Sequence, residues 1–222
     1  LWKNMTNFQK RILTSLIALP TSIYLLVIGG APLTFFLFFV LFAGLHELLN
    51  TFKKNFTKVF LFFILILSLY CIYFLANESL YSKHILFYSI AVCISSDIGG
   101  YIFGKIFKWK KLTNISPKKT ISGVFGSYFL SFVCLFAFNE YYLQSISSTF
   151  TISFLFGINQ IFITFILSTV AQAGDLTISY FKRLDKIKDT GKILPGHGGV
   201  FDRIDGLMFI SILSYLLYFI VT

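Results

Sequence analysis

Long apolar segments restrict the fold of this chain more than any other feature of its sequence. Each segment is at least 17 residues long, and at a helical rise of about 1.5 Å per residue it can cross a hydrocarbon core about 30 Å thick. Lipid cannot satisfy open backbone groups, and strand-like alternation is absent, so we expect helices. The sequence therefore predicts an all-α polytopic membrane protein with about seven transmembrane helices. The segments cover residues 12–28, 33–49, 57–76, 84–104, 121–139, 150–175 and 204–222.

The composition is typical of a membrane protein. Hydrophobic residues make up 56% of the 222 residues and charged residues 13%, against about 25% charged residues in an average soluble domain. The net charge of +10 would suggest a nucleic-acid partner in a soluble protein, but here it indicates loop orientation and anionic partners. We therefore expect no nucleic acid as a partner. The three cysteines lie singly in apolar segments, without the spacing of a disulfide framework or a paired metal site.

The basic residues are distributed very unevenly between the two sides of the membrane. Eighteen of the nineteen lysines and arginines lie on the N-terminal arm or on the second, fourth and sixth connections, whereas Lys83 lies on the third. Cytoplasmic loops of membrane proteins carry an excess of such residues. The sequence therefore predicts that the N-terminus and the even-numbered connections are cytoplasmic.

A polar island interrupts the apolar chain between Ser179 and Asp205. It holds four of the nine acidic residues and six of the nineteen basic ones. Acidic residues at the edges of membrane segments are costly and therefore functional candidates, and Asp175 lies at such an edge. Asp175, Asp202 and Asp205 can gather around a divalent cation, and oxygen ligands without a cysteine cluster favour Mg²⁺ over Zn²⁺.

Basic side chains accompany these carboxylates in the polar island. Lys182, Arg183 and Lys188 add positive charges that a metal site alone does not need. Carboxylates that hold Mg²⁺, together with cations that neutralise phosphate oxygens, suit a metal-bound triphosphate. The alternative is a solvated cluster of juxtamembrane charge, which does not explain the carboxylates at a membrane boundary.

A glycine-rich loop follows Pro195 inside the polar island. Its sequence is Gly196-His197-Gly198-Gly199, and a backbone without side chains can approach a ligand closely. His197 is a candidate acid or a candidate hydrogen-bond donor to phosphate. The alternative is an ordinary loop histidine.

The fourth connection ends in a second polar motif, Ser116-Pro117-Lys118-Lys119-Thr120. Ser116 or Thr120 can cap the next helix, with Pro117 at its first position. A helix N-terminus flanked by two lysines is a natural phosphate site. The alternative to a phosphate site is that the motif only caps the helix and follows the general bias of basic residues towards the cytoplasm. That bias explains the lysines but not the order of the motif.

Two further acidic residues lie near cytoplasmic ends of predicted helices. Asp97 is followed by Gly99 and Gly100, small residues that permit close helix packing beside a buried carboxylate. It is therefore either a functional acid or a satisfied residue on a packing face. Glu47 is either a functional acid or a residue at the membrane interface.

Together these motifs resemble the signature of the phosphatidate cytidylyltransferases (CDP-diacylglycerol synthases). The likeness covers almost the whole chain and includes Asp97 before Tyr101. Within the polar island the matching residues are Ser179, Phe181, Lys182, Arg183, Lys188, Asp189, Gly191, Leu194, Pro195, His197, Gly198, Gly199, Asp202, Arg203 and Asp205. Outside it they are Ser116, Pro117, Lys118, Lys119, Thr120, Gly123, Gly174, Asp175 and Leu176.

The resemblance implies an enzyme of phospholipid biosynthesis that converts CTP and phosphatidate to CDP-diacylglycerol and diphosphate. It implies Mg²⁺ as the cofactor, K⁺ as a candidate second cation, and a multi-pass protein of the inner (plasma) membrane that is often a homodimer. The active site would lie at the cytoplasmic face, where CTP meets phosphatidate of the cytoplasmic leaflet. We expect one integral membrane domain over residues 1–222, with N-terminal helices in 1–94 and the catalytic helices and loops in 95–222.

The resemblance also assigns roles to individual residues. Asp175 and Asp202 would be metal ligands, with Asp205 as a weaker candidate. The residues expected to be catalytic are Asp175, Lys182, Arg183, Lys188, Asp189, Asp202 and Arg203. Those expected to bind substrate are Ser116, Lys118, Lys119, Thr120, His197, Gly198 and Gly199.

Two other classes of protein compete with this interpretation. A membrane lipid kinase that phosphorylates a polyprenol or phytol would show similar clusters at helix ends, but it needs a base for a hydroxyl group. A transporter or channel with Asp97 and Asp175 in an ion path would place acidic residues deep inside the membrane segments. Here they gather near one face, which argues against a transporter.

Overall fold

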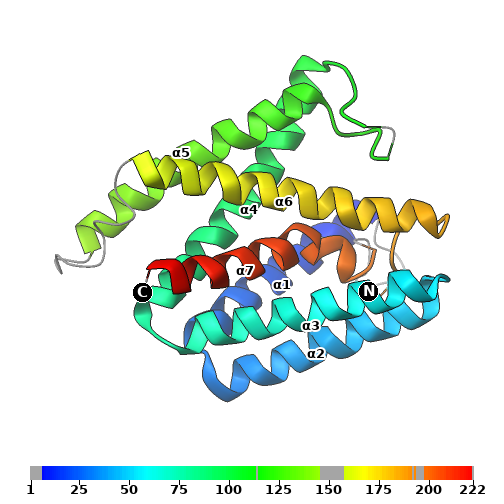
Figure 1. Ribbon diagram of the computed structural model, residues 1–222, viewed down its shortest axis with the longest axis horizontal. Coiled ribbons are helices and arrows are strands. Elements are labelled where there is room, and N and C mark those ends of the chain that lie inside the picture. The colour runs from blue at the N-terminus through cyan, green and yellow to red at the C-terminus, as the bar shows by residue number, and fades with distance from the viewer. Residues whose placement is uncertain (1–6, 114, 146–157, 192, 194–197, 222) are drawn as a thin grey trace.

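The computed structural model describes residues 7–113, 115–145, 158–191, 193 and 198–221 (Figure 1). Its described part has no β-strand, and a single isolated bridge joins Lys111 to Thr120. The prediction of an all-α fold is therefore confirmed, and each helix overlaps a predicted apolar segment, although residues 150–157 of the segment predicted at 150–175 lie outside the described residues. The helices are α1 (Asn7–Ile28), α2 (Gly30–Thr51), α3 (Asn55–Asn77), α4 (Leu80–Phe107), α5 (Ile121–Ser145), α6 (Ile158–Leu184) and α7 (Phe201–Val221).

Six of these helices, α2 to α7, are long and apolar enough to cross a membrane. The apolar part of α1, over Leu13–Ile28, is shorter, so the expected count of about seven is reached only if α1 is included. Large apolar side chains such as Phe35 and Phe63 are exposed on the outside of the bundle. A helix that is apolar all round is typical of a membrane span. The chain is therefore a multi-pass membrane protein.

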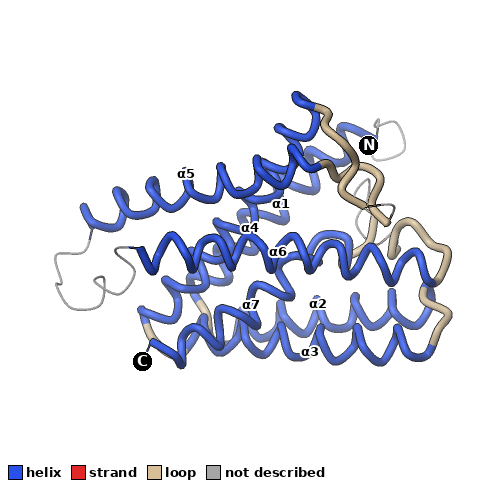
Figure 2. Tube along the Cα trace, turned by 45° about the horizontal axis from the view of Figure 1, so that its top comes forward, coloured by secondary structure: helices blue, strands red, loops and turns tan. Residues whose placement is uncertain are grey.

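The helices enclose three apolar clusters along the bundle. In Figures 1 and 2, α2, α3, α6 and α7 run roughly side by side, whereas α4 crosses them obliquely in Figure 1. One cluster joins α2, α3, α6 and α7 around Leu48, Leu65, Ile178 and Phe201. It lies beneath the end of the bundle where α2 and α6 end and α7 begins. This apolar packing places the polar connections of that end on a rigid base.

Backbone contact joins α4 to α5. A Cβ atom added to Gly99 would overlap the carbonyl oxygen of Gly126, and one added to Gly123 would lie 2.8 Å from the carbonyl oxygen of Gly100. Nearby, the Ser127 hydroxyl donates a hydrogen bond of 2.7 Å to the Ser96 carbonyl oxygen. The expectation of close helix packing around Gly99 and Gly100 is thus confirmed. This packing positions the Asp97 turn of α4 against the start of α5.

Candidate active site at the polar end of the bundle

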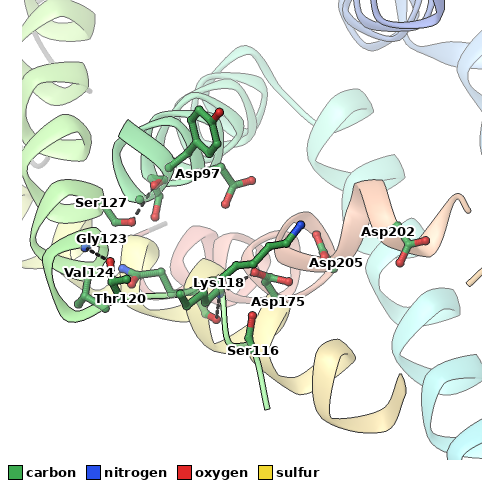
Figure 3. Close-up of a pocket in the computed structure, with 15 residues that line it drawn as sticks. Asp97, Ser116, Lys118, Thr120, Gly123, Val124, Ser127, Asp175, Asp202 and Asp205 are labelled. Atoms are coloured by element: carbon green, nitrogen blue, oxygen red, sulfur yellow. Dashed lines mark hydrogen bonds and ion pairs between the residues drawn. The ribbon is translucent and has the colours of Figure 1, made fainter. Parts of the chain in front are cut away.

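A cavity of about 320 Å³ opens at the end of the bundle that carries the polar connections (Figure 3). Its walls come from α4, α5, α6, α7 and the connection before α5. Most lining residues are polar or charged, which is unusual between membrane helices and marks the cavity as the candidate site. The lining residues are Ser96, Asp97, Gly100, Tyr101, Ser116, Lys118, Lys119, Thr120, Gly123, Val124, Ser127, Gln172, Asp175, Asp202 and Asp205.

Four carboxylates from three different helices line this cavity: Asp97, Asp175, Asp202 and Asp205. Asp175 of α6 and Asp205 of α7 are within hydrogen-bonding reach of each other, and Figure 3 shows Asp97 of α4 across the same space. Two carboxylates this close repel each other unless a proton or a cation lies between them. Asp175 and Asp205 therefore form a natural place for a cation with oxygen ligands.

Lys119 brings positive charge to this acidic group. Its Nζ lies 2.6 Å from Oδ2 of Asp175 and donates a hydrogen bond of 3.2 Å to the Gln172 carbonyl oxygen. The connection that carries it folds back on itself, since the Leu112 N–H donates to the Lys119 carbonyl oxygen at 2.8 Å. Lys119 thus reaches from the connection before α5 to the Asp175 turn of α6.

The start of α5 confirms the predicted segment start at 121 and Thr120 as one of the two candidate caps, but the placement of Pro117 differs from the prediction. The helix begins at Ile121, and the Thr120 hydroxyl accepts a hydrogen bond of 3.1 Å from the Gly123 N–H, so Thr120 is the cap. The expectation that Pro117 occupies the first helical position is wrong. Pro117 lies instead in a turn, where the Lys119 N–H donates to the Ser116 carbonyl oxygen at 3.0 Å. Backbone pairing of the fourth connection keeps this turn outside the helix.

Asp202 has a different environment from the other predicted metal ligands. Its Oδ1 lies 2.8 Å from Nζ of Lys182, and its Oδ2 accepts hydrogen bonds from the N–H groups of Thr190 at 2.9 Å and Gly199 at 3.1 Å. Within the described residues, no three His, Cys, Asp or Glu side chains lie close enough to share a metal ion. Asp202 lines the cavity, but its oxygens are already engaged by protein donors.

The remaining predicted residues fall into four classes. Ser116, Lys118 and Thr120 line the cavity. Gly198 and Gly199 lie in the connection before α7, where Gly198 has a φ of +88° that favours glycine. Arg183, Lys188, Asp189 and Arg203 are exposed and are not among the lining residues. His197 lies outside the described residues.

Arg183 nevertheless joins two parts of the polar end. Its Nε donates a hydrogen bond of 3.3 Å to the Ile115 carbonyl oxygen, and its Nη1 donates one of 3.2 Å to the Ile187 carbonyl oxygen. The side chain therefore ties the end of α6 to the turn that carries Ser116 and Lys118. Its position fits a supporting role for that wall of the cavity.

Sequence reasoning missed Gln172 and assigned no definite role to Asp97 or Glu47, yet the structure places all three at or beside the site. Asp97 and Gln172 line the cavity, and Glu47 is buried against the connection before α7. A signal for Gln172 does exist, since Gln160, Thr164, Ser168 and Gln172 recur every four residues and so share one face of α6. For Glu47 the signal is a lone acidic residue in an apolar helix.

The comparisons with known proteins agree with the resemblance seen in the sequence. The model of the Cytidylyltransferase family matches residues 59–221. The chain is 31% identical, over 226 residues, to a phosphatidate cytidylyltransferase of Rickettsia conorii. The aligned region covers 97% of this chain and 93% of that protein. The match therefore includes the cavity and both of its polar connections.

Two further relatives match over a shorter range. A phosphatidate cytidylyltransferase of Staphylococcus aureus is 40% identical over 128 residues, which is 57% of this chain and 46% of that protein. One of Helicobacter pylori is 37% identical over 137 residues, which is 59% of this chain and 46% of that protein. The chain thus spans about half of the length of these curated relatives.

Proposed function

This chain belongs to the cytidylyltransferase family, and from that premise we propose that it transfers the cytidylyl group of CTP to phosphatidate. The products are CDP-diacylglycerol and diphosphate, for phospholipid biosynthesis. The observation that carries the proposal is the cavity in which Asp175 and Asp205 approach each other beneath Lys119. Carboxylates and a lysine in one cavity suit two phosphate-bearing substrates.

In the proposed reaction, a phosphate oxygen of phosphatidate attacks the α-phosphorus of CTP. The bond from the α-phosphorus to the oxygen that bridges to the β-phosphorus breaks, and diphosphate leaves with its electron pair. The attacking oxygen already carries negative charge at neutral pH, so no general base is needed. The chain's task is to position the two substrates and to balance their charge.

The residues of the cavity fit Mg²⁺. Asp175 and Asp205 would hold the ion, because hard oxygen ligands are what it prefers and it is usually bound by one or two carboxylates together with substrate phosphates. When bound, Mg²⁺ would neutralise negative charge on the phosphates of CTP. Asp202 would join it only if its contacts with Lys182 and the loop backbone opened. K⁺ is a candidate second cation.

The basic residues would bind the phosphates. Lys119 and Lys118 lie on the wall opposite α6 and α7, where lysine charge can meet phosphate oxygens. Ser116 offers a hydroxyl group on the same wall. Lys182 would act mainly by holding Asp202, while Arg183, Lys188, Asp189 and Arg203 would shape the field at the mouth of the cavity.

We place this end of the bundle in the cytoplasm. It carries the connections between α2 and α3, α4 and α5, and α6 and α7, which hold most of the lysines and arginines. Phosphatidate would enter from the cytoplasmic leaflet of the inner membrane, and CTP from the cytoplasm. We also propose that the protein forms a homodimer, as the family resemblance implies. Cross-linking in membranes would test this.

Incubation of the purified protein with CTP, phosphatidate and Mg²⁺, followed by identification of the products, tests the proposal. We expect CDP-diacylglycerol and diphosphate in equal amounts. A phosphorylated alcohol formed from a polyprenol would favour a lipid kinase instead. Solute flux into proteoliposomes without CTP, and no CDP-diacylglycerol, would favour a transporter.

A further inference from the structure

We propose that Glu47 of α2 is a positioning residue that holds the connection before α7 and, through it, Asp202. Glu47 is 1% exposed. Its Oε1 accepts a hydrogen bond of 2.7 Å from the Val200 N–H, and its Oε2 accepts one of 3.1 Å from the Phe201 N–H. The residue lies outside the part of the chain that the family model matches, residues 59–221.

The two N–H groups belong to the start of α7, which begins at Phe201. The first N–H groups of a helix have no partner inside the helix, and they carry partial positive charge. A buried carboxylate is costly unless donors surround it. Two backbone N–H groups and a hydroxyl group donate to Glu47, and these donors offset its negative charge.

That hydroxyl group belongs to Thr190, which donates to Oε2 of Glu47 at 3.2 Å. The N–H of the same threonine donates to Asp202 at 2.9 Å, and its carbonyl oxygen accepts a hydrogen bond of 2.7 Å from the Thr51 hydroxyl of α2. Thr190 is therefore fixed on one side by α2 and on the other side by Asp202. The position of the Asp202 carboxylate depends on this arrangement.

Two glycines leave room for the Glu47 carboxylate. A Cβ atom on Gly191 would lie 2.7 Å from its Oε1, and one on Gly199 would lie 2.6 Å from its Oε2. The Gly199 N–H also donates to Asp202 at 3.1 Å. These glycines therefore allow the loop to wrap around a carboxylate from α2. Glu47 sets the path of the loop, and the loop supplies the donors that orient Asp202 beside Lys182.

The test compares Glu47→Gln and Glu47→Asp with Glu78→Gln, a matched control on an exposed glutamate just after α3. The glutamine keeps the volume but turns an NH₂ group towards N–H donors. Each protein is assayed for kcat and KM, for melting temperature in detergent, and for backbone hydrogen exchange at Thr190, Val200 and Phe201. The activity readout rests on the proposed cytidylyl transfer, whereas hydrogen exchange does not.

For Glu47→Gln we expect faster exchange at Val200 and Phe201, and a kcat lowered about 100-fold by misplacement of the site. The KM for CTP should change much less, and Glu78→Gln should behave like wild type. Glu47→Asp should recover part of the kcat. Wild-type exchange and wild-type kcat in Glu47→Gln would overturn the inference. If the wild type itself makes no CDP-diacylglycerol, the proposed function fails, and exchange alone then decides on Glu47.

A second pair of variants keeps the inference testable if Glu47→Gln does not fold. Thr190→Val removes the hydroxyl that donates to Glu47, and Thr190→Ser keeps it. We expect faster exchange at Val200 and a lower kcat for the valine variant, with recovery in the serine variant. Equal behaviour of the two variants would contradict the role of Glu47.

Discussion

Two groups of carboxylates occupy the polar end of this bundle, and they differ in their contacts. The loop group consists of Glu47, Asp185 and Asp202, whose oxygens accept hydrogen bonds from backbone N–H groups. The cavity group consists of Asp97, Asp175 and Asp205, which line the same cavity as Asp202; within this group, Asp205 accepts a hydrogen bond from the N–H of its neighbour Gly206. The same residue types thus serve as structural caps in one group and as candidate ligands in the other.

The difference lies in what balances the negative charge. Asp185 accepts from the N–H groups of Lys53 and Lys54 at the start of α3, and Glu47 does the same for α7. In the cavity group, Asp175 and Asp205 contact each other, and Lys119 is the cation paired with Asp175. Two carboxylates in contact repel each other, so a bound cation should stabilise this group more than the loop group. The following predictions test this division, beginning with the largest effect.

Asp175→Asn should nearly abolish activity. The substitution removes a carboxylate from the candidate cation site and from the ion pair with Lys119, and loss of such a contact typically lowers the rate about 10²–10³-fold. The melting temperature in detergent should stay close to that of wild type, because one of two repelling carboxylates is removed. Full turnover by this variant, measured as CDP-diacylglycerol formation, would break the division.

Lys119→Met should lower kcat about 100-fold, because it removes the cation that lies over the cavity group. Lys118→Met is the matched comparison, since Lys118 lines the same cavity but is exposed. The decrease in kcat for Lys118→Met should be smaller, and the KM of this variant for a phosphate-bearing substrate should rise. Equal effects of the two substitutions on kcat would show that the contact between Lys119 and Asp175 has no special role.

Asp202→Asn should lower both stability and activity, unlike Asp175→Asn. Breaking a buried ion pair from one side typically costs about 3–5 kcal/mol, and here the substitution leaves Lys182 without its partner. The double variant with Lys182→Met should recover part of the melting temperature. Loss of activity at an unchanged melting temperature would move Asp202 into the cavity group as a metal ligand.

Asp185→Ala should have the smallest effect. It removes the acceptor at the start of α3, and a lost helix cap typically costs about 1 kcal/mol. The melting temperature should fall slightly, while kcat at saturating substrate stays at the wild-type value. A loss of kcat comparable to that of Asp175→Asn would mean that the two groups are not separate.

The helices could be predicted from sequence because apolar length alone decides where a chain can cross lipid. The segment predicted at 57–76 is observed as α3 (Asn55–Asn77), and that at 84–104 as α4 (Leu80–Phe107). The close packing at Gly99 could be predicted as well, because small residues signal contact between backbones. In both cases the information is local in the chain.

The division among the carboxylates could not be predicted, since it depends on contacts between distant residues. Glu47 and Val200 are 153 positions apart, and no local pattern indicates that one caps the other. Asp202 and Asp205 are three residues apart in sequence, yet Asp202 faces Lys182 and the loop while Asp205 faces Asp175. Pro117 was misplaced for a similar reason, because backbone pairing across the fourth connection holds it in a turn before α5.

Cation binding tests the central claim most directly. Mn²⁺, used as a paramagnetic substitute for Mg²⁺, is titrated into detergent-solubilised protein with CTP and followed by electron paramagnetic resonance. Wild type and Asp185→Ala should bind Mn²⁺ equally well, whereas Asp175→Asn and Asp205→Asn should bind it far more weakly. Wild-type Mn²⁺ binding by both Asp175→Asn and Asp205→Asn would contradict the assignment of the cavity group as the cation site.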